Sequence, residues 1–114
     1  MNGANILELI SLRDSAHLRH WATTSYAEHK AIGGFYDDLT DLLDTFMETY
    51  QGKYGRLFIG GIIAPKAFAS LEIVNNAMVE VEAIEKGIKD SDLLNILADM
   101  KQLCNHTKYK LSLT

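Results

Sequence analysis

Apolar residues recur at every third or fourth position between residues 32 and 50, and this spacing limits the fold more than any other feature of the sequence. Side chains at these intervals lie on one face of an α-helix. The apolar positions are Ile32, Phe35, Leu39, Leu42, Leu43, Phe46 and Tyr50. Ser25 followed by Glu28 is typical of a capping box at a helix start, and Gly52 favours a helix end near Gln51. A long helix with one apolar face must bury that face against other elements, so the pattern predicts a helical bundle.

Three further segments show a similar apolar periodicity, which predicts four helices in all. Helix starts are expected at Asn5, Pro65 and residues 90–92, and helix ends near Trp21 and Gly87. The apolar positions of the first helix are Ile6, Leu9, Ile10, Ala16 and Trp21. Those of the third are Phe68, Leu71, Val74, Met78, Val81 and Ile84, and those of the fourth are Leu93, Ile96, Leu97, Met100, Leu103 and Thr107.

Residues 52–65, between the second and third helices, form an apolar segment that is interrupted by glycines. An extended chain of this length spans about 45 Å, enough to run back along the whole second helix. A simple helical hairpin needs only roughly two to eight connecting residues, although a hairpin stays open as the alternative. We therefore predict an all-α, ferritin-like four-helix bundle with a long crossover between helices 2 and 3, and one domain over residues 1–114.

Composition excludes several classes of function. The net charge of −4 disfavours nucleic-acid binding, which depends on neutralising phosphates. No apolar stretch has the length of a membrane-spanning helix, and the N-terminus lacks the pattern of a secretion signal. Cys104 is the one cysteine, so neither an internal disulfide nor a cysteine metal cluster is expected, and a reducing cytoplasm fits.

Histidines and carboxylates at helical spacing are the strongest chemical signal in the chain. His17 and His20 lie one turn apart near the end of the first helix, and His29 follows the capping box of the second. Asp44 and Glu48 lie one turn apart further along that helix. About 22 Å of helix separates His29 from Asp44, so within one chain they cannot bind the same ion. Two copies paired antiparallel through helices 1 and 2 would bring them together, with the two-fold axis between Tyr36 and Leu39.

This pattern resembles the ferroxidase signature of Dps-type ferritins, a family in which the metal site lies between subunits. The resemblance covers roughly residues 13–50. It implies metal ligands at His20, His29, Asp44 and Glu48, with supporting positions at His17 and Asp37. Iron or zinc is the implied ion. The turn before His29 is shorter than in that family, and Gly33 stands where the family has a carboxylate. The resemblance therefore implies a degenerate site and a weak ferroxidase at most, whose rate Gly33→Asp is expected to raise.

A non-catalytic function is the alternative. An acidic helix face is most often simply solvated, and His106 has no partner at helical spacing. The segments from Thr23 to Ala31 and from Gln51 to Gly55 also resemble small tailed-phage proteins of unknown function. For a phage-encoded protein the expected location is the host cytoplasm or the virion. Exposed apolar residues within 58–63 would then favour a structural or host-interaction protein.

Overall fold

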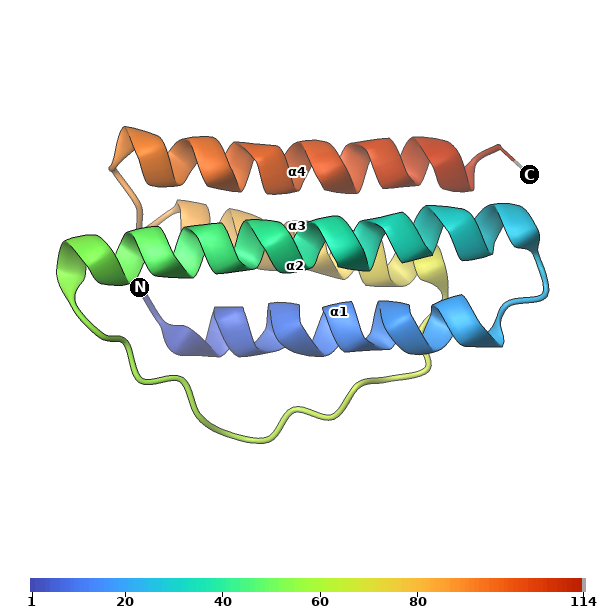
Figure 1. Ribbon diagram of the computed structural model, residues 1–114, viewed down its shortest axis with the longest axis horizontal. Helices are drawn as coiled ribbons and strands as arrows, with labels where there is room; N and C mark the ends of the chain where they lie inside the picture. The colour runs from blue at the N-terminus through green and yellow to red at the C-terminus, as the bar shows by residue number, and fades with distance from the viewer. Residues whose placement is uncertain (114) are drawn as a thin grey trace.

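The computed structural model describes residues 1–113, and these residues form four α-helices and no strand (Figure 1). The helices are α1 (Gly3–Ala22), α2 (Tyr26–Tyr54), α3 (Ser70–Glu85) and α4 (Ser91–Leu111). The predicted all-helical class and the number of helices are thus confirmed for this part of the chain. None of the described helices is both long and apolar enough to cross a membrane.

Each helix packs against two neighbours: α1 and α4 each contact both α2 and α3. The chain runs along α1, returns along α2, and then crosses back outside α1 before α3 begins (Figure 1). As a result α2 and α3 run in the same direction, which a short hairpin could not produce. The long connection, residues 55–69, is therefore a crossover, as the length of the apolar segment predicted.

The apolar stripes of all four helices meet in one core. Its largest fully buried members include Phe35 and Phe46 of α2, together with residues from each other helix such as Leu9, Ile73 and Leu97. Burial of such side chains is the main favourable term in folding, at about 1.5–3 kcal/mol each. Two expected members lie outside the core.

Trp21 and Leu71 are the two exceptions, with 67% and 50% of their surface exposed. Trp21 lies at the last turn of α1 and Leu71 in the first turn of α3. Both residues fit the apolar periodicity and were therefore expected in the core. At the end of a bundle, however, a side chain on the apolar face has no neighbouring helix to pack against. Cys104 does lie in the core, and burial raises the pKa of its thiol to about 11, so it stays protonated at neutral pH.

Two buried serines of α1 hold the crossover in place. The Ser11 hydroxyl donates to the Ala64 carbonyl at 3.0 Å, and the Lys66 backbone N–H donates to Ser15 Oγ at 2.9 Å. These bonds keep the chain extended past Pro65, which does not begin the third helix as predicted. The helix begins only at Ser70, after the crossover has passed along α1.

The helix ends confirm one predicted cap and correct others. Ser25 caps α2 as predicted, since its hydroxyl accepts from the Glu28 N–H at 3.2 Å. Asn2, not Asn5, caps α1, and the Asn5 side chain instead donates to Glu80 of α3 at 2.8 Å. The second helix runs past Gln51 to Tyr54 and ends at Gly55, whose φ of +86° favours glycine.

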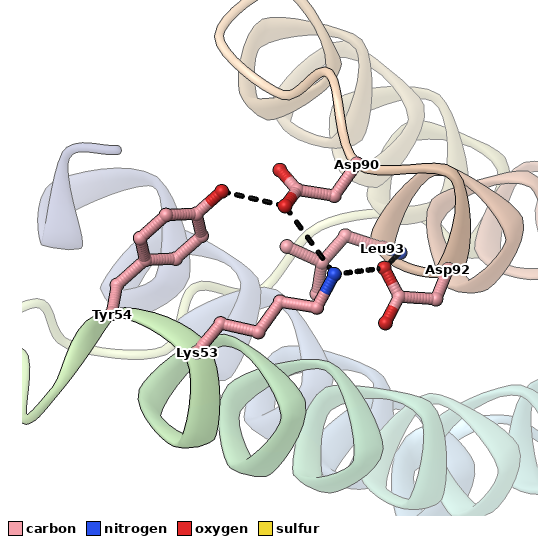
Figure 2. Close-up of polar contacts among 5 residues, drawn as sticks. All are labelled: Lys53, Tyr54, Asp90, Asp92 and Leu93. Atoms are coloured by element: carbon pink, nitrogen blue, oxygen red, sulfur yellow. Dashed lines mark hydrogen bonds and ion pairs between the residues drawn. The ribbon is translucent and has the colours of Figure 1, made fainter.

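A polar network joins the end of α2 to the start of α4 (Figure 2). The Tyr54 hydroxyl donates to Asp90 at 2.6 Å, and Lys53 contacts both Asp90 and Asp92. The Leu93 N–H donates to Asp92 at 3.0 Å. Asp90 occupies the cap position of α4, but its carboxylate bonds α2 instead of the helix N–H groups. The network thus fixes the distance between two adjacent helix ends.

This network predicts a loss of stability in acid. The hydrogen bond from Tyr54 lowers the pKa of the Asp90 carboxyl, and the bond from Lys53 lowers that of Asp92. A carboxyl with a lowered pKa in the folded state stabilises the fold above the unfolded pKa and loses this effect as the pH falls through the folded pKa. Stability should therefore fall below about pH 4.

Urea unfolding at pH 7 and pH 3 checks this prediction. Asp90→Asn should be less stable than the wild type at pH 7, and the difference should shrink at pH 3. Asp99→Asn on the exposed side of α4 serves as the control and should follow the wild type at both values. An identical pH dependence in the wild type and Asp90→Asn would contradict the assignment.

Candidate functional site

Two histidines meet where α1 turns into α2. His20 lies in the last turns of α1, His29 lies in the first turns of α2, and only residues 23–25 separate the two helices. The imidazole rings stack with their centroids 3.6 Å apart and their planes 16° from parallel. Both residues are half-buried. The expected meeting of these two side chains across the helix pair is therefore observed.

Reciprocal hydrogen bonds orient both rings. His20 Nδ1 lies 2.8 Å from the His29 carbonyl oxygen, and His29 Nδ1 lies 2.7 Å from the His20 carbonyl oxygen. A carbonyl oxygen only accepts, so each Nδ1 must carry the proton. In the neutral form each Nε2 then keeps a lone pair. An Nδ1–H bonded to a backbone carbonyl is also the arrangement that orients many metal-binding histidines.

The same bonds have a structural effect that needs no metal. Two side chain–backbone hydrogen bonds connect the end of α1 to the start of α2, each contributing about 1 kcal/mol. Arg19 and Glu28 add an ion pair of 2.9 Å across the same turn. The histidine pair therefore closes the α1–α2 turn whatever else it does.

His17 lies in an aromatic row beside this pair. Its ring stacks on Tyr36 of α2, with centroids 4.4 Å apart and planes 20° from parallel, and lies 4.3 Å from the ring of Trp21. The rings of Tyr36 and His20 also lie edge to face, with their centroids 5.5 Å apart. A groove of about 570 Å³ opens next to His17 and Tyr36, and its lining also includes Asp37 and Asp41. His17 thus packs on aromatic rings beside the histidine pair.

The carboxylates lie away from the histidines. Asp44 and Glu48 are exposed on α2, and Asp37 is exposed between them and the turn. About 22 Å of helix separates His29 from Asp44. In residues 1–113 no group of three histidine, cysteine, aspartate or glutamate side chains is placed to hold a metal ion. One chain therefore brings together two of the four expected ligands and leaves the other two on a distant part of the same helix.

Gly33 has a role that the sequence analysis missed. A Cβ at this position would lie 2.8 Å from His20 Nδ1 and 2.9 Å from its Cε1, so the imidazole occupies the space of a side chain. At the neighbouring Gly34 a Cβ would meet no side chain and no other segment of the chain within 4 Å. A pair of glycines inside a helix signals a close approach, but the sequence cannot say which glycine makes it. An aspartate at position 33 would displace His20, so Gly33→Asp is not a clean test of iron oxidation.

The two glycines predict opposite responses to alanine. Gly34→Ala should raise the free energy of unfolding by up to about 1 kcal/mol, because alanine favours the helix and meets open space. Gly33→Ala should lower it by about 1–3 kcal/mol, because the added methyl forces the His20 ring from its stacked position. Urea denaturation of both variants measures the difference. Equal stabilisation by the two substitutions would show that His20 does not rest on Gly33.

Comparisons with known proteins agree with one of the two resemblances seen in the sequence. The chain is 28% identical over 99 residues to an uncharacterized 14.6 kDa protein from the mobD–ri intergenic region of Enterobacteria phage T4, a match that covers 85% of this chain and 77% of that protein. No solved structure matches the chain. The phage resemblance is thus supported, whereas nothing in the comparisons supports the Dps-type family. The profile of a family of unknown function matches residues 20–111, and the chain belongs to that family, DUF5856.

Proposed function

We propose that this protein is a ferritin-like bundle that binds a metal ion, iron or zinc, between two copies of the chain. The observation that carries the proposal is the stacked pair of His20 and His29, whose Nδ1 atoms are both held by backbone carbonyls. In the neutral form this arrangement leaves the Nε2 lone pair of each histidine free to bind an ion. The order of the helices, with α2 and α3 parallel, also matches ferritin-like topology.

The remaining ligands of the proposed site come from the partner copy. Asp44 and Glu48 are exposed one turn apart, a spacing that lets both carboxylates reach the same ion. In an antiparallel dimer built on α1 and α2, these carboxylates reach the histidine pair of the other chain, and two identical sites form. Asp37 would lie near the two-fold axis in each copy, and Arg13, which lines the same groove, provides a nearby positive charge.

The ligand set favours binding over catalysis. Two imidazoles and two carboxylates suit a tetrahedral zinc ion at least as well as iron. If the ion were Fe(II), the chemistry at the site would be its oxidation to Fe(III) by dioxygen. Position 33 contributes no carboxylate, and the His20 ring fills the space where one would lie. We therefore propose a weak ferroxidase at most. The two histidines of one chain would bind the ion, and the carboxylates of the partner copy would complete its coordination.

Metal binding should depend on pH and on the four proposed ligands. Zinc titration by calorimetry should show affinity that falls in acid, because protonated imidazole cannot bind a cation. His29→Ala should abolish binding, and so should Asp44→Asn, whose exposed side chain contributes little to the fold. His106→Ala, an exposed histidine on α4, should leave binding unchanged. Unchanged titration of His29→Ala would refute the site.

Mixing two inactive variants tests whether the site spans two chains. A protein with His20→Ala and His29→Ala lacks one half of each site, and a protein with Asp44→Asn and Glu48→Gln lacks the other. Random exchange of subunits should restore about a quarter of the wild-type zinc capacity, because half of the dimers are mixed and each has one complete site. Light scattering should give twice the 12.7 kDa chain mass. A site within one chain would gain nothing from mixing, and a monomeric mass would exclude the dimer.

A second function, a non-catalytic structural or host-interaction protein of a phage, is favoured by the crossover. Phe58 and Ile62, four residues apart in the crossover, are 90% and 98% exposed, and apolar residues that gather on a surface mark sites of protein–protein interaction. The similar T4 protein is consistent with a phage setting. A protein that binds neither zinc nor iron in the calorimetric titration, while keeping its helical content, would favour this second function.

A further inference from the structure

A cavity of about 330 Å³ lies at the end of the bundle where α2 and α3 begin and α4 ends, on the right in Figure 1. Its polar lining consists of Ser25, Glu28, Ser70, Lys108, Lys110 and Ser112. None of the proposed metal ligands lines this cavity. Its volume is in the range of sites that hold small molecules.

Ser70 is the feature that points to a ligand. The residue is only 2% exposed, and its hydroxyl has no hydrogen-bond partner among the described residues. Ser70 is also the first residue of α3. The N-cap residue of this helix is Ala69, whose side chain cannot accept a hydrogen bond from the first turn. The backbone N–H groups of the first turn therefore lack a side-chain acceptor. A buried hydroxyl and an uncapped helix start, side by side in one cavity, provide donors for an acceptor that the chain does not supply.

The charges around the cavity favour an anion. Lys108 and Lys110 bring two positive charges in a chain whose net charge is −4. Glu28 opposes them, but its carboxylate is already paired with Arg19 at 2.9 Å. Burial of Glu28 raises the pKa of its carboxyl group. Hydrogen bonds, chiefly from Thr23 and Arg19, outweigh this effect and lower the pKa overall, so Glu28 is ionised. The Ser70 hydroxyl also lowers the pKa of Glu28, by the smallest amount of these groups, but it does not reach the geometry of a hydrogen bond with any described residue.

Helix dipoles largely cancel at this position. The N-terminal ends of α2 and α3 each carry about half a positive charge, and the C-terminal ends of α1 and α4, at the same end of the bundle, each carry about half a negative one. The carbonyls of Lys108 and Tyr109 already accept from the Ser112 N–H at 3.2 and 3.0 Å. The two lysines therefore decide the sign of the local field.

We propose that this cavity binds a small organic anion, with an oxyanion head at Ser70 and the start of α3 and a short apolar body that extends from there toward the mouth of the cavity. The head accepts hydrogen bonds from the Ser70 hydroxyl and the first-turn N–H groups, and the lysines neutralise its charge. The rest of the lining is aliphatic, from Ala27, Ala69, Leu71 and Leu111, which favours a body of a few carbon atoms over a bare inorganic ion.

Amide NMR titration of the full chain with four probes tests the proposal. Butyl phosphate and butyrate should both shift the amides of Ser70 and Leu71 to saturation, and the tighter of the two identifies the head group. Inorganic phosphate should bind more weakly, and neutral butanol should produce no saturable shift. Butanol binding as tightly as the anions, or no saturation by any anion up to about 50 mM, would overturn the proposal.

Single substitutions separate recognition from folding. Ser70→Ala should weaken butyl phosphate binding about tenfold without lowering stability, because it removes a hydroxyl that has no partner in the free protein. Lys108→Gln should weaken binding about threefold, whereas Lys89→Gln, the same change at the opposite end of the bundle, should leave it unchanged. Glu28→Gln should tighten binding, because it removes the one opposing carboxylate. Unaltered affinity in Ser70→Ala would show that the head group does not bind there.

Discussion

The length of α2 is the constraint on which the rest of the structure depends. Its 29 residues extend about 44 Å, close to the 43 Å longest dimension of the molecule. Its apolar face, which includes Phe35 and Phe46, must be covered along that length, and both α1 and α4 pack against it. After α2 the chain stands at one end of the molecule, and residues 55–69 carry it back along α1 before α3 begins. The parallel order of α2 and α3 follows from that return.

The two ends of the bundle differ chemically because of this order. One end collects the starts of α2 and α3, and there the stacked histidines, the Arg19–Glu28 pair and the uncapped Ser70 lie near one another. At the other end the chain leaves α2 and enters α4, and the carboxylates of Asp90 and Asp92 are bonded by Lys53 and Tyr54 (Figure 2). The unpartnered Ser70 hydroxyl and the uncapped start of α3 therefore lie at one end, while at the other end both aspartates find partners within the chain.

The His20–His29 pair explains why a structural and a functional interpretation of the same residues can both hold. Each Nδ1 closes the turn between α1 and α2, while each Nε2 is left free of that task. Gly33 makes room for the His20 ring. The glycine that departs from the Dps pattern therefore helps to position one of the two histidines. Asp44 and Glu48 are the residues that distinguish the two functions.

The sequence by itself determined the number of helices, their approximate limits, the Ser25 cap and the crossover, because apolar periodicity and chain length act locally. It also predicted that His20 and His29 would meet, since an antiparallel helix pair with a short turn leaves little choice. Only the tertiary structure decided that Asn2 caps α1, that Pro65 stays extended against Ser15, and that His20 occupies the space beside Gly33. It alone revealed the unpartnered Ser70 hydroxyl, because the residues that form that cavity come from α2, α3 and α4, far apart in the chain. Contacts between distant segments depend on how the helices pack against each other, and a local sequence pattern does not encode that packing.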